Sequence, residues 1–168
     1  MHLHLLHVHI ARKMPRQGAS LRVDRHARPP TEVIEAWLSL LRTERALIDK
    51  VEARLKRAGL PPLNCYHVLN EVARAPKGML RQVHVQARTQ LAQYTLCRLL
   101  DRLERAGLMR RQQCQRDGRN NVLLLTAKGR ALRRSMWPVY AAAIEAHFGS
   151  RLSRAEAEQL AGLLEKLG

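Results

Sequence analysis

Apolar residues recur at helical spacing through most of the chain. Over residues 31–57 they return every three, four or seven positions, which predicts one long helix with Thr31 as its N-cap. Gly59 follows as the expected C-terminal stop. Further helices are expected over about residues 61–75, after a Pro-Pro start, and over about residues 81–88. Residues 31–88 are therefore expected to be helical apart from the turns between helices.

A fourth helix is expected over about residues 92–106, and its pattern is the most regular of all. Its apolar face consists of four leucines, Leu96, Leu99, Leu100 and Leu103. The pattern then changes to that of a hairpin, with strands over residues 108–115 and 121–125 joined by a turn over residues 116–120.

Two more helices are expected after the hairpin. Thr126 can cap a fifth helix through His147, with an interruption near Pro138. Ser153 and Glu156 form a capping box for a last helix that runs to about residue 167. The two helices complete a mainly α chain with a single β-hairpin.

The order helix, turn, helix, hairpin predicts the fold class: mainly α with a small β-hairpin wing, a winged helix-turn-helix with flanking dimerisation helices. We place the winged helix-turn-helix DNA-binding domain at residues 60–126. The long first helix and the last two exceed what one small winged domain can bury, so we expect residues 31–58 and 127–168 to dimerise. Residues 1–30, with six Lys or Arg and one acid, are expected to form a basic, flexible arm.

The net charge of the chain indicates the class of its binding partner. The 168 residues contain 30 Lys and Arg against 14 Asp and Glu, a formal charge of +16, which indicates a polyanionic partner. From Arg98 to Arg134 there are eleven basic residues against three acids, which is half of the net charge of the chain. This concentration predicts double-stranded DNA bound over the fourth helix and the wing. No apolar run is long enough to span a bilayer and no signal peptide is evident, so we expect no membrane partner and a cytoplasmic location.

Catalytic and metal chemistry find little support in the sequence. Cys65, Cys97 and Cys114 are odd in number and lack a CxxC spacing, which argues against a disulfide framework or a structural zinc site. No nucleophile–base pair or phosphate-cradling glycine loop is present, so we predict neither an enzyme nor a cofactor. Four histidines alternate at the N-terminus (His2, His4, His7 and His9), but without acidic or Cys partners we predict no metal site there.

Three stretches resemble the MarR family of regulators: LCRLLDRLERAGLMRR (residues 96–111), RDGR (116–119) and LLLTAKGRAL (123–132). The resemblance implies a homodimer whose terminal helices interlock, and a palindromic operator read by two copies of the fourth helix. It also implies that Arg119, at the wing tip, enters the minor groove. Ala92 and Gln93 depart from the pattern, because relatives often have Ser-Arg there.

We expect DNA contacts from the polar face of the fourth helix, from the first wing strand and from the wing. These residues are Gln93, Tyr94, Thr95, Arg98, Arg102, Arg111, Arg116, Asp117, Arg119 and Asn120. Of these, Asp117 is expected to orient an arginine rather than to touch DNA.

The resemblance also implies an effector, either a small phenolic or aromatic acid or an oxidant acting on a thiol. Candidate effector residues are Trp37, Tyr66, His67, Cys97 and Tyr140. Plain core packing remains the alternative for the aromatic residues, and burial as a small hydrophobe for the cysteines. The leading prediction is a sequence-specific repressor released from a palindromic operator by an aromatic acid or thioester-like effector. A redox-responsive regulator that uses a cysteine, with Cys97 the best candidate, and a constitutive architectural DNA-binding protein are the alternatives.

Overall fold

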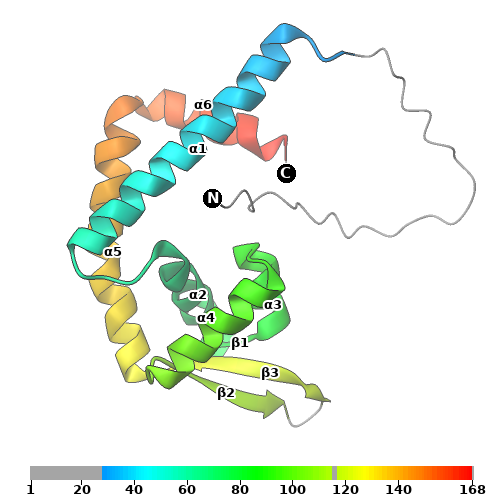
Figure 1. Ribbon diagram of the computed structural model, residues 1–168, viewed down its shortest axis with the longest axis vertical. Coiled ribbons are helices and arrows are strands. Elements are labelled where there is room, and N and C mark those ends of the chain that lie inside the picture. The colour runs from blue at the N-terminus through cyan, green and yellow to red at the C-terminus, as the bar shows by residue number, and fades with distance from the viewer. Residues whose placement is uncertain (1–27, 115–116, 168) are drawn as a thin grey trace, which may run out of the picture. The chain divides into compact units, whose positions relative to one another are not determined.

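The computed structural model describes residues 28–114 and 117–167, and their side chains except those of residues 113–121. The helices and strands, with a short 3₁₀ turn before β1 and another after α5, are α1 (Thr31–Arg57), α2 (Leu63–Arg74), β1 (Met79–Arg81), α3 (Gln82–Thr89), α4 (Gln93–Arg105), β2 (Met109–Cys114), β3 (Asp117–Leu125), α5 (Ala127–His147) and α6 (Arg154–Glu165). This is the expected mainly α winged helix-turn-helix (Figure 1). The chain divides into two units between Leu41 and Arg42, within α1, and the winged helix-turn-helix lies within the second.

The helix boundaries follow from backbone capping. At the start of α1 the carbonyl of Pro30 accepts the N–H groups of Val33 (3.0 Å) and Ile34 (3.1 Å). Pro30 is therefore the N-cap and Thr31 the first helical residue, so the prediction that Thr31 caps this helix was wrong by one position.

Helices α1 and α4 end in the same way, on a glycine with positive φ. In α4, Gly107 has φ 68° and donates to the carbonyl of Glu104 at 2.9 Å, while Leu108 donates to the carbonyl of Leu103 at 2.9 Å. This pair of bonds is the Schellman motif, which turns the chain sharply out of a helix. Because of this turn, β2 starts immediately beside the helix that precedes it. Gly59, with φ 67°, ends α1 by the same bonds, as expected.

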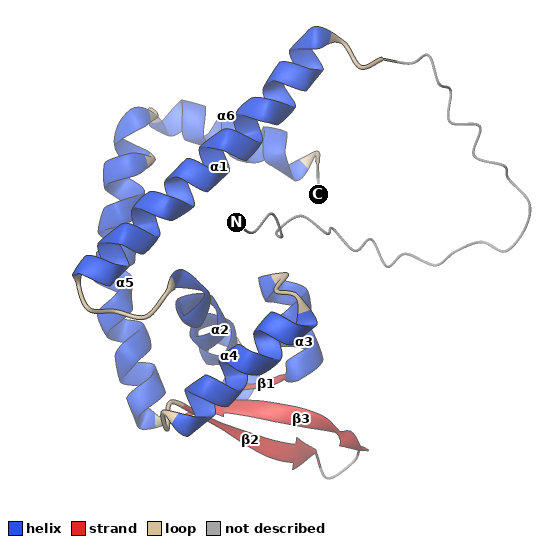
Figure 2. Ribbon diagram, viewed as in Figure 1, coloured by secondary structure: helices blue, strands red, loops and turns tan. Residues whose placement is uncertain are grey.

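The sheet has one strand more than the expected hairpin (Figure 2). Its order is β1-β3-β2 with antiparallel pairing, and Leu80 of β1 lies opposite Leu123 of β3. β1 was not predicted: Arg81 was expected to start a helix, and three residues are too few to establish an alternating pattern. β3 begins at Asp117, within the expected turn at residues 116–120, so the strand is longer than expected.

The core of the winged domain lies between its helices and its sheet. All four leucines of α4 are buried, at 0–2% exposure, as their spacing predicted. They belong to one apolar cluster with residues of α2 such as Val68, Leu69 and Val72, and with Leu123 of the sheet. Because this packing uses the whole apolar face of α4, the opposite face is left to solvent.

A second apolar cluster joins α5 to α2 and to the end of α1. Its buried members are Val51, Leu55, Leu63, Tyr66, Met136 and Ala143. α5 passes through Pro138 without the expected interruption. Proline removes one helical hydrogen bond, to the carbonyl of Arg134. The packing of Met136 and Ala143, both fully buried on either side of Pro138, favours a continuous helix here.

Two predicted caps are confirmed. The hydroxyl of Thr126 accepts the N–H of Gly129 at 3.0 Å and opens α5, and Ser153 and Glu156 form the capping box of α6. In the described part of the chain, no helix is both long enough and apolar enough to cross a membrane.

Candidate nucleic-acid interface and ligand cavity

The outward face of α4 carries a stripe of polar residues opposite the buried leucines. Tyr94, Arg98, Asp101 and Arg105 follow one another at helical spacing and are all exposed, Tyr94 to 70%. We call these four residues the α4 stripe. Three of the four can donate hydrogen bonds to a polyanion, and only Asp101 is acidic. Tyr94 and Arg98 were expected from the sequence, whereas Arg105 was not, although its spacing from Arg98 was visible.

The N-terminus of α4 is open. Its N-cap residue, Ala92, makes no side-chain capping bond, and Gln93, Tyr94 and Thr95 are exposed. In the first turn of a helix the backbone N–H groups have no intrahelical acceptor, and they can bind a phosphate. Alanine in place of the more usual serine leaves these donors without a side-chain acceptor.

Arg98 is oriented by Tyr94, one turn earlier. The guanidinium donates from Nη1 to the Tyr94 hydroxyl at 2.8 Å, and its central carbon lies 5.2 Å from the ring centroid. The contact combines a hydrogen bond with a cation–π interaction. It restricts a flexible side chain while leaving other N–H donors of Arg98 free to bind a ligand.

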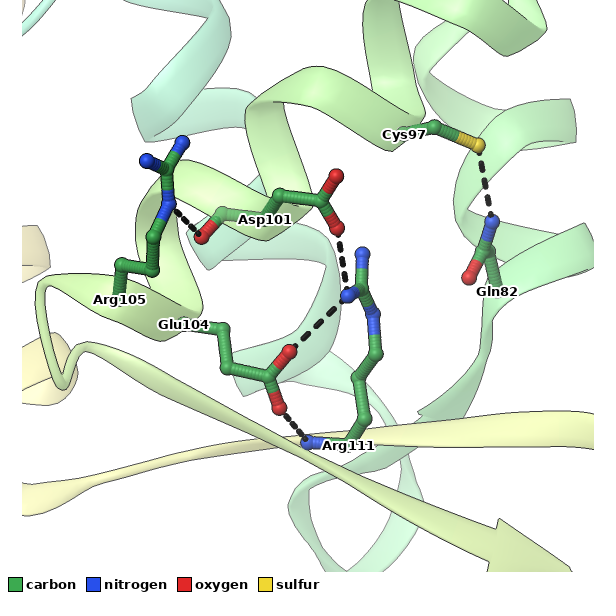
Figure 3. Close-up of polar contacts among 6 residues, drawn as sticks. All are labelled: Gln82, Cys97, Asp101, Glu104, Arg105 and Arg111. Carbon is green, nitrogen blue, oxygen red and sulfur yellow. Dashed lines mark hydrogen bonds and ion pairs between the residues drawn. The ribbon is translucent and has the colours of Figure 1, made fainter.

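Arg111, an expected DNA contact, instead binds two carboxylates of α4 (Figure 3). Its Nη1 lies 2.6 Å from Asp101 Oδ1 and 2.9 Å from Glu104 Oε2, and its backbone N–H donates to Glu104 Oε1 at 3.1 Å. The Arg111 side chain is only 23% exposed. This geometry favours an internal role for Arg111 over contact with DNA.

Arg102 and Cys97 lie on the two flanks of the α4 stripe. Burial raises the pKa of the Cys65 thiol in α2, and Arg102, which is hydrogen-bonded to that thiol, acts in the opposite direction. Arg102 is therefore directed toward α2. Cys97 is partly buried on the other flank, where its sulfur accepts a 3.5 Å hydrogen bond from Gln82 of α3 (Figure 3).

The wing residues fall largely outside the described part of the chain. This holds for Arg116 and for the side chains of Asp117, Arg119 and Asn120. The structure gives only the backbone of β3 from Asp117 onward. The expected roles of these four residues remain predictions.

A cavity of about 590 Å³ lies between α2 and α5. Its lining residues are Tyr66, His67, Asn70 and Arg74 from α2, and Arg133, Arg134, Trp137, Tyr140 and Ile144 from α5. Three of the expected effector residues, Tyr66, His67 and Tyr140, are thus brought together. Trp37 and Cys97 are not among the lining residues, and Trp137 supplies the indole that we expected from Trp37.

Aromatic rings form much of the cavity wall. Tyr66 and Trp137 are stacked with centroids 6.2 Å apart and planes inclined by 19°. Tyr140 meets Tyr66 edge-on at 5.2 Å and Trp137 edge-on at 6.1 Å. Trp137 was not predicted from the sequence, although it lies one helical turn before Tyr140. Such a wall suits a flat apolar ligand.

The polar groups of the cavity are mostly cationic or neutral donors. Arg133 donates from Nη1 to Asn70 Oδ1 at 2.9 Å, which orients its guanidinium. Burial raises the pKa values of the Tyr66 and Tyr140 phenols, so both remain protonated donors at neutral pH. Burial also lowers the pKa of His67, an effect that Glu71 and Glu52 partly oppose. The ionisable groups of the wall therefore favour an anion over a cation.

The described residues form no candidate metal site. Among the described residues, no group of three or more His, Cys, Asp or Glu side chains is placed to hold an ion. The four N-terminal histidines lie outside the described residues.

Comparison with known proteins identifies the fold. Comparison with curated proteins gave no match by sequence. Among solved structures, Sco3205 of Streptomyces coelicolor, a MarR family transcriptional regulator in complex with DNA, superposes with a TM-score of 0.78 at 24% identity, over 86% of this chain and 90% of that one. AbsC, a MarR family transcriptional regulator from the same organism, gives a TM-score of 0.75 at 26% identity, over 83% and 95%.

A third similar structure is that of Bordetella bronchiseptica BpsR, whose DNA binding is regulated by 6-hydroxynicotinic acid. It gives a TM-score of 0.70 at 23% identity, over 79% of this chain and 98% of that one. Residues 58–120, from the end of α1 into the wing, match the model of the MarR family. The match covers the winged helix-turn-helix of this chain, and the fold is that of MarR family transcriptional regulators.

Proposed function

We propose that the protein is a DNA-binding repressor that acts as a homodimer on a palindromic operator and is released by a small aromatic acid. The observation that supports DNA binding most directly is the α4 stripe. Its cationic and hydrogen-bonding residues face solvent because the opposite face of the helix is fully used by the leucine core. A recognition helix needs this division between a buried and a reading face.

In the proposed complex, α4 lies in the major groove. The open N–H groups at its start bind a phosphate, and Gln93, Tyr94 and Thr95 contact the backbone or base edges next to it. Arg98, oriented by Tyr94, binds the O6 and N7 acceptors of a guanine. The wing, with Arg116, Arg119 and Asn120, follows the backbone and places Arg119 in the minor groove.

Exposed apolar residues support the homodimer. On the first turns of α1, Val33 and Trp37 are more than half exposed, and Leu163 and Leu164 of α6 are exposed to a similar degree. Apolar surface of this kind is normally covered by a partner. We assign residues 31–58 and 127–168 to dimerisation and residues 60–126 to DNA binding. Two α4 helices in such a dimer would read half-sites about one helical turn apart, which requires a palindrome.

The cavity between α2 and α5 supports the effector. Its stacked and edge-on aromatic rings fit a planar ring, and Arg74, Arg133 and Arg134 provide partners for a carboxylate. α2 belongs to the DNA-binding domain and α5 leads away from it, so a ligand between them can change the orientation of α4. We infer an aromatic carboxylate as the effector class.

Selection of duplexes from a random library, followed by mobility-shift titration, tests the proposal. We expect a palindromic sequence, bound far more tightly than a random duplex, with affinity falling steeply as salt rises. Equal affinity for the selected and random duplexes would contradict specific regulation. A thermal-shift screen with hydroxylated benzoates and nicotinates should then give ligands that stabilise the protein and weaken DNA binding. If no such acid binds, the effector part fails and a constitutive DNA-binding protein remains.

A further inference from the structure

We propose that Arg111 is a positioning residue for DNA recognition: by binding the carboxylate of Asp101, it prevents Asp101 from pairing with Arg98. The proposal rests on the proposed function, in which the α4 stripe faces DNA. It assigns to a wing strand a direct influence on the recognition helix that precedes it.

Asp101 is the acidic member of a stripe that would otherwise attract phosphate. It lies three residues after Arg98, a spacing at which side chains on a helix surface are neighbours. Its side chain is 53% exposed. An unpaired carboxylate at this position has two consequences: it competes with DNA for the Arg98 guanidinium, and it repels the phosphate backbone.

Arg111 removes the first of these consequences by its geometry. It reaches Asp101 from β2, with Nη1 2.6 Å from Oδ1 (Figure 3). Glu104 holds Arg111 in place at two points, Nη1 (2.9 Å) and the backbone N–H (3.1 Å). Glu104 is thus the anchor of Arg111, and Asp101 is the group that Arg111 restrains.

Arg98 is not paired with the Asp101 carboxylate. It donates to the Tyr94 hydroxyl and lies over the Tyr94 ring, and within the described residues it forms no ion pair. Arg105, the other cation of the stripe, bonds the backbone carbonyl of Asp101 at 3.3 Å rather than its carboxylate. The carboxylate of Asp101 is therefore committed to Arg111, and both stripe arginines keep donors for DNA.

A set of matched variants tests this inference, with the selected palindromic duplex and a random duplex of equal length as probes. Arg111→Met retains much of the side-chain volume and removes the charge. We expect it to weaken binding of the selected duplex by about tenfold, and we expect Asp101→Asn added to it to restore affinity to within about threefold of wild type. Asp101→Asn alone should strengthen binding less than it does in the Arg111→Met background.

Glu104→Gln is the matched control, because Glu104 binds the same nitrogen of Arg111 but lies off the stripe. Added to Arg111→Met, it should restore no affinity. In a protein that carries Arg98→Gln, the Arg111→Met substitution should reduce DNA affinity little further, because residue 98 then has no charge with which Asp101 can pair. Arg111→Lys with and without Asp101→Asn gives a second series, should Arg111→Met unfold the protein.

Thermal unfolding separates positioning from a purely structural role. Arg111→Met combined with Asp101→Asn and Arg111→Met combined with Glu104→Gln should both remain less stable than wild type. Only the combination with Asp101→Asn should recover DNA binding. Equal recovery with Glu104→Gln, or affinities that simply follow Tm, would overturn the proposal. Failure of the wild-type protein to prefer the selected duplex would instead reject the proposed function, and this inference with it.

Discussion

Gly129, in the first turn of α5, packs directly on the backbone carbonyl of Leu108, where the chain enters β2. A Cβ atom at residue 129 would collide with the carbonyl oxygen and lie 3.0 Å from the carbonyl carbon. Thr126 strengthens the same junction. Its hydroxyl donates to the carbonyl of Gly107 at 2.8 Å and accepts the N–H of Gly129, and its own N–H donates to the carbonyl of Leu108 at 3.2 Å. The wing and α5 are therefore joined through backbone groups that cannot move aside.

Gly129→Ala should accordingly destabilise the protein. Because the obstacle is backbone, we expect the free energy of unfolding to fall by about 2 kcal/mol or more, with Tm lower by roughly 4–8 °C. Gly162→Ala is the control, since a Cβ at that position in α6 meets nothing within 4 Å. It should raise the free energy of unfolding by about 0.5–1 kcal/mol, as expected for alanine in a helix. Calorimetry of the two variants measures both changes in the free energy of unfolding. Equal stabilities of the two variants would contradict a rigid junction between the wing and α5.

Elements defined by their own residues could be predicted from the sequence, whereas elements that depend on distant residues could not. α4 was placed to within a residue at each end, because four leucines and the glycine after them define it without help from the rest of the chain. β1 was missed, because its three residues become a strand only when β3 supplies hydrogen bonds from more than forty residues away.

The candidate site divides in the same way. The exposure of Tyr94 and Arg98 followed from the leucine period, whereas the inward role of Arg111 did not. In sequence, Arg111 belongs to a run of basic residues, and nothing local separates it from Arg110. Its contact with Asp101 and Glu104 arises because the Gly107 turn folds β2 back beside α4. Similarly, Trp137 joins the cavity through the packing of α5 on α2, which an aromatic count cannot reveal.

His67 should make stability depend on pH in the mildly acidic range. Burial holds the pKa of His67 below its ordinary value of 6.5 in the folded state, with Glu71 and Glu52 opposing the shift. Well above pH 6.5 the imidazole is neutral in both the folded and the unfolded chain and has no effect. As pH falls below 6.5, the unfolded chain binds the proton first, so stability is lost until the folded pKa is passed.

The comparison of wild type with His67→Gln tests this. Between pH 7.5 and about pH 5, urea unfolding should show a smaller loss of stability in the variant than in wild type. An NMR titration of the His67 ring, assigned by the same variant, should give a midpoint below 6.5. A midpoint above 6.5 would contradict burial as the dominant influence.

The exposed apolar residues at the start of α1 give a prediction about assembly. Ile34 and Trp37 lie one turn apart and are 38% and 53% exposed. If they are covered in a homodimer, Trp37→Glu should shift the protein toward monomer in light scattering at micromolar concentration, because a carboxylate would be buried. Glu35→Gln, on the same helix, should leave the mass unchanged. A wild-type protein that is already monomeric under these conditions would exclude the homodimer.

Arg98 and Arg102 provide the sharpest comparison on the recognition helix, since both are exposed arginines of α4 and lie one turn apart. Arg98 belongs to the α4 stripe and is oriented by Tyr94, whereas Arg102 is hydrogen-bonded to the thiol of Cys65 in α2. A bidentate contact from arginine to guanine contributes about 1–3 kcal/mol of discrimination against the wrong base, so Arg98→Ala should lose roughly tenfold to a hundredfold in affinity for the selected duplex. It should also lose the preference at one base pair of each half-site. Arg102→Ala should weaken binding less and by a similar factor on every operator variant, because it changes only the general attraction to phosphate. Mobility-shift titration against single-base operator variants distinguishes the two arginines, and an even loss across all variants for Arg98→Ala would assign Arg98 to the phosphate backbone instead.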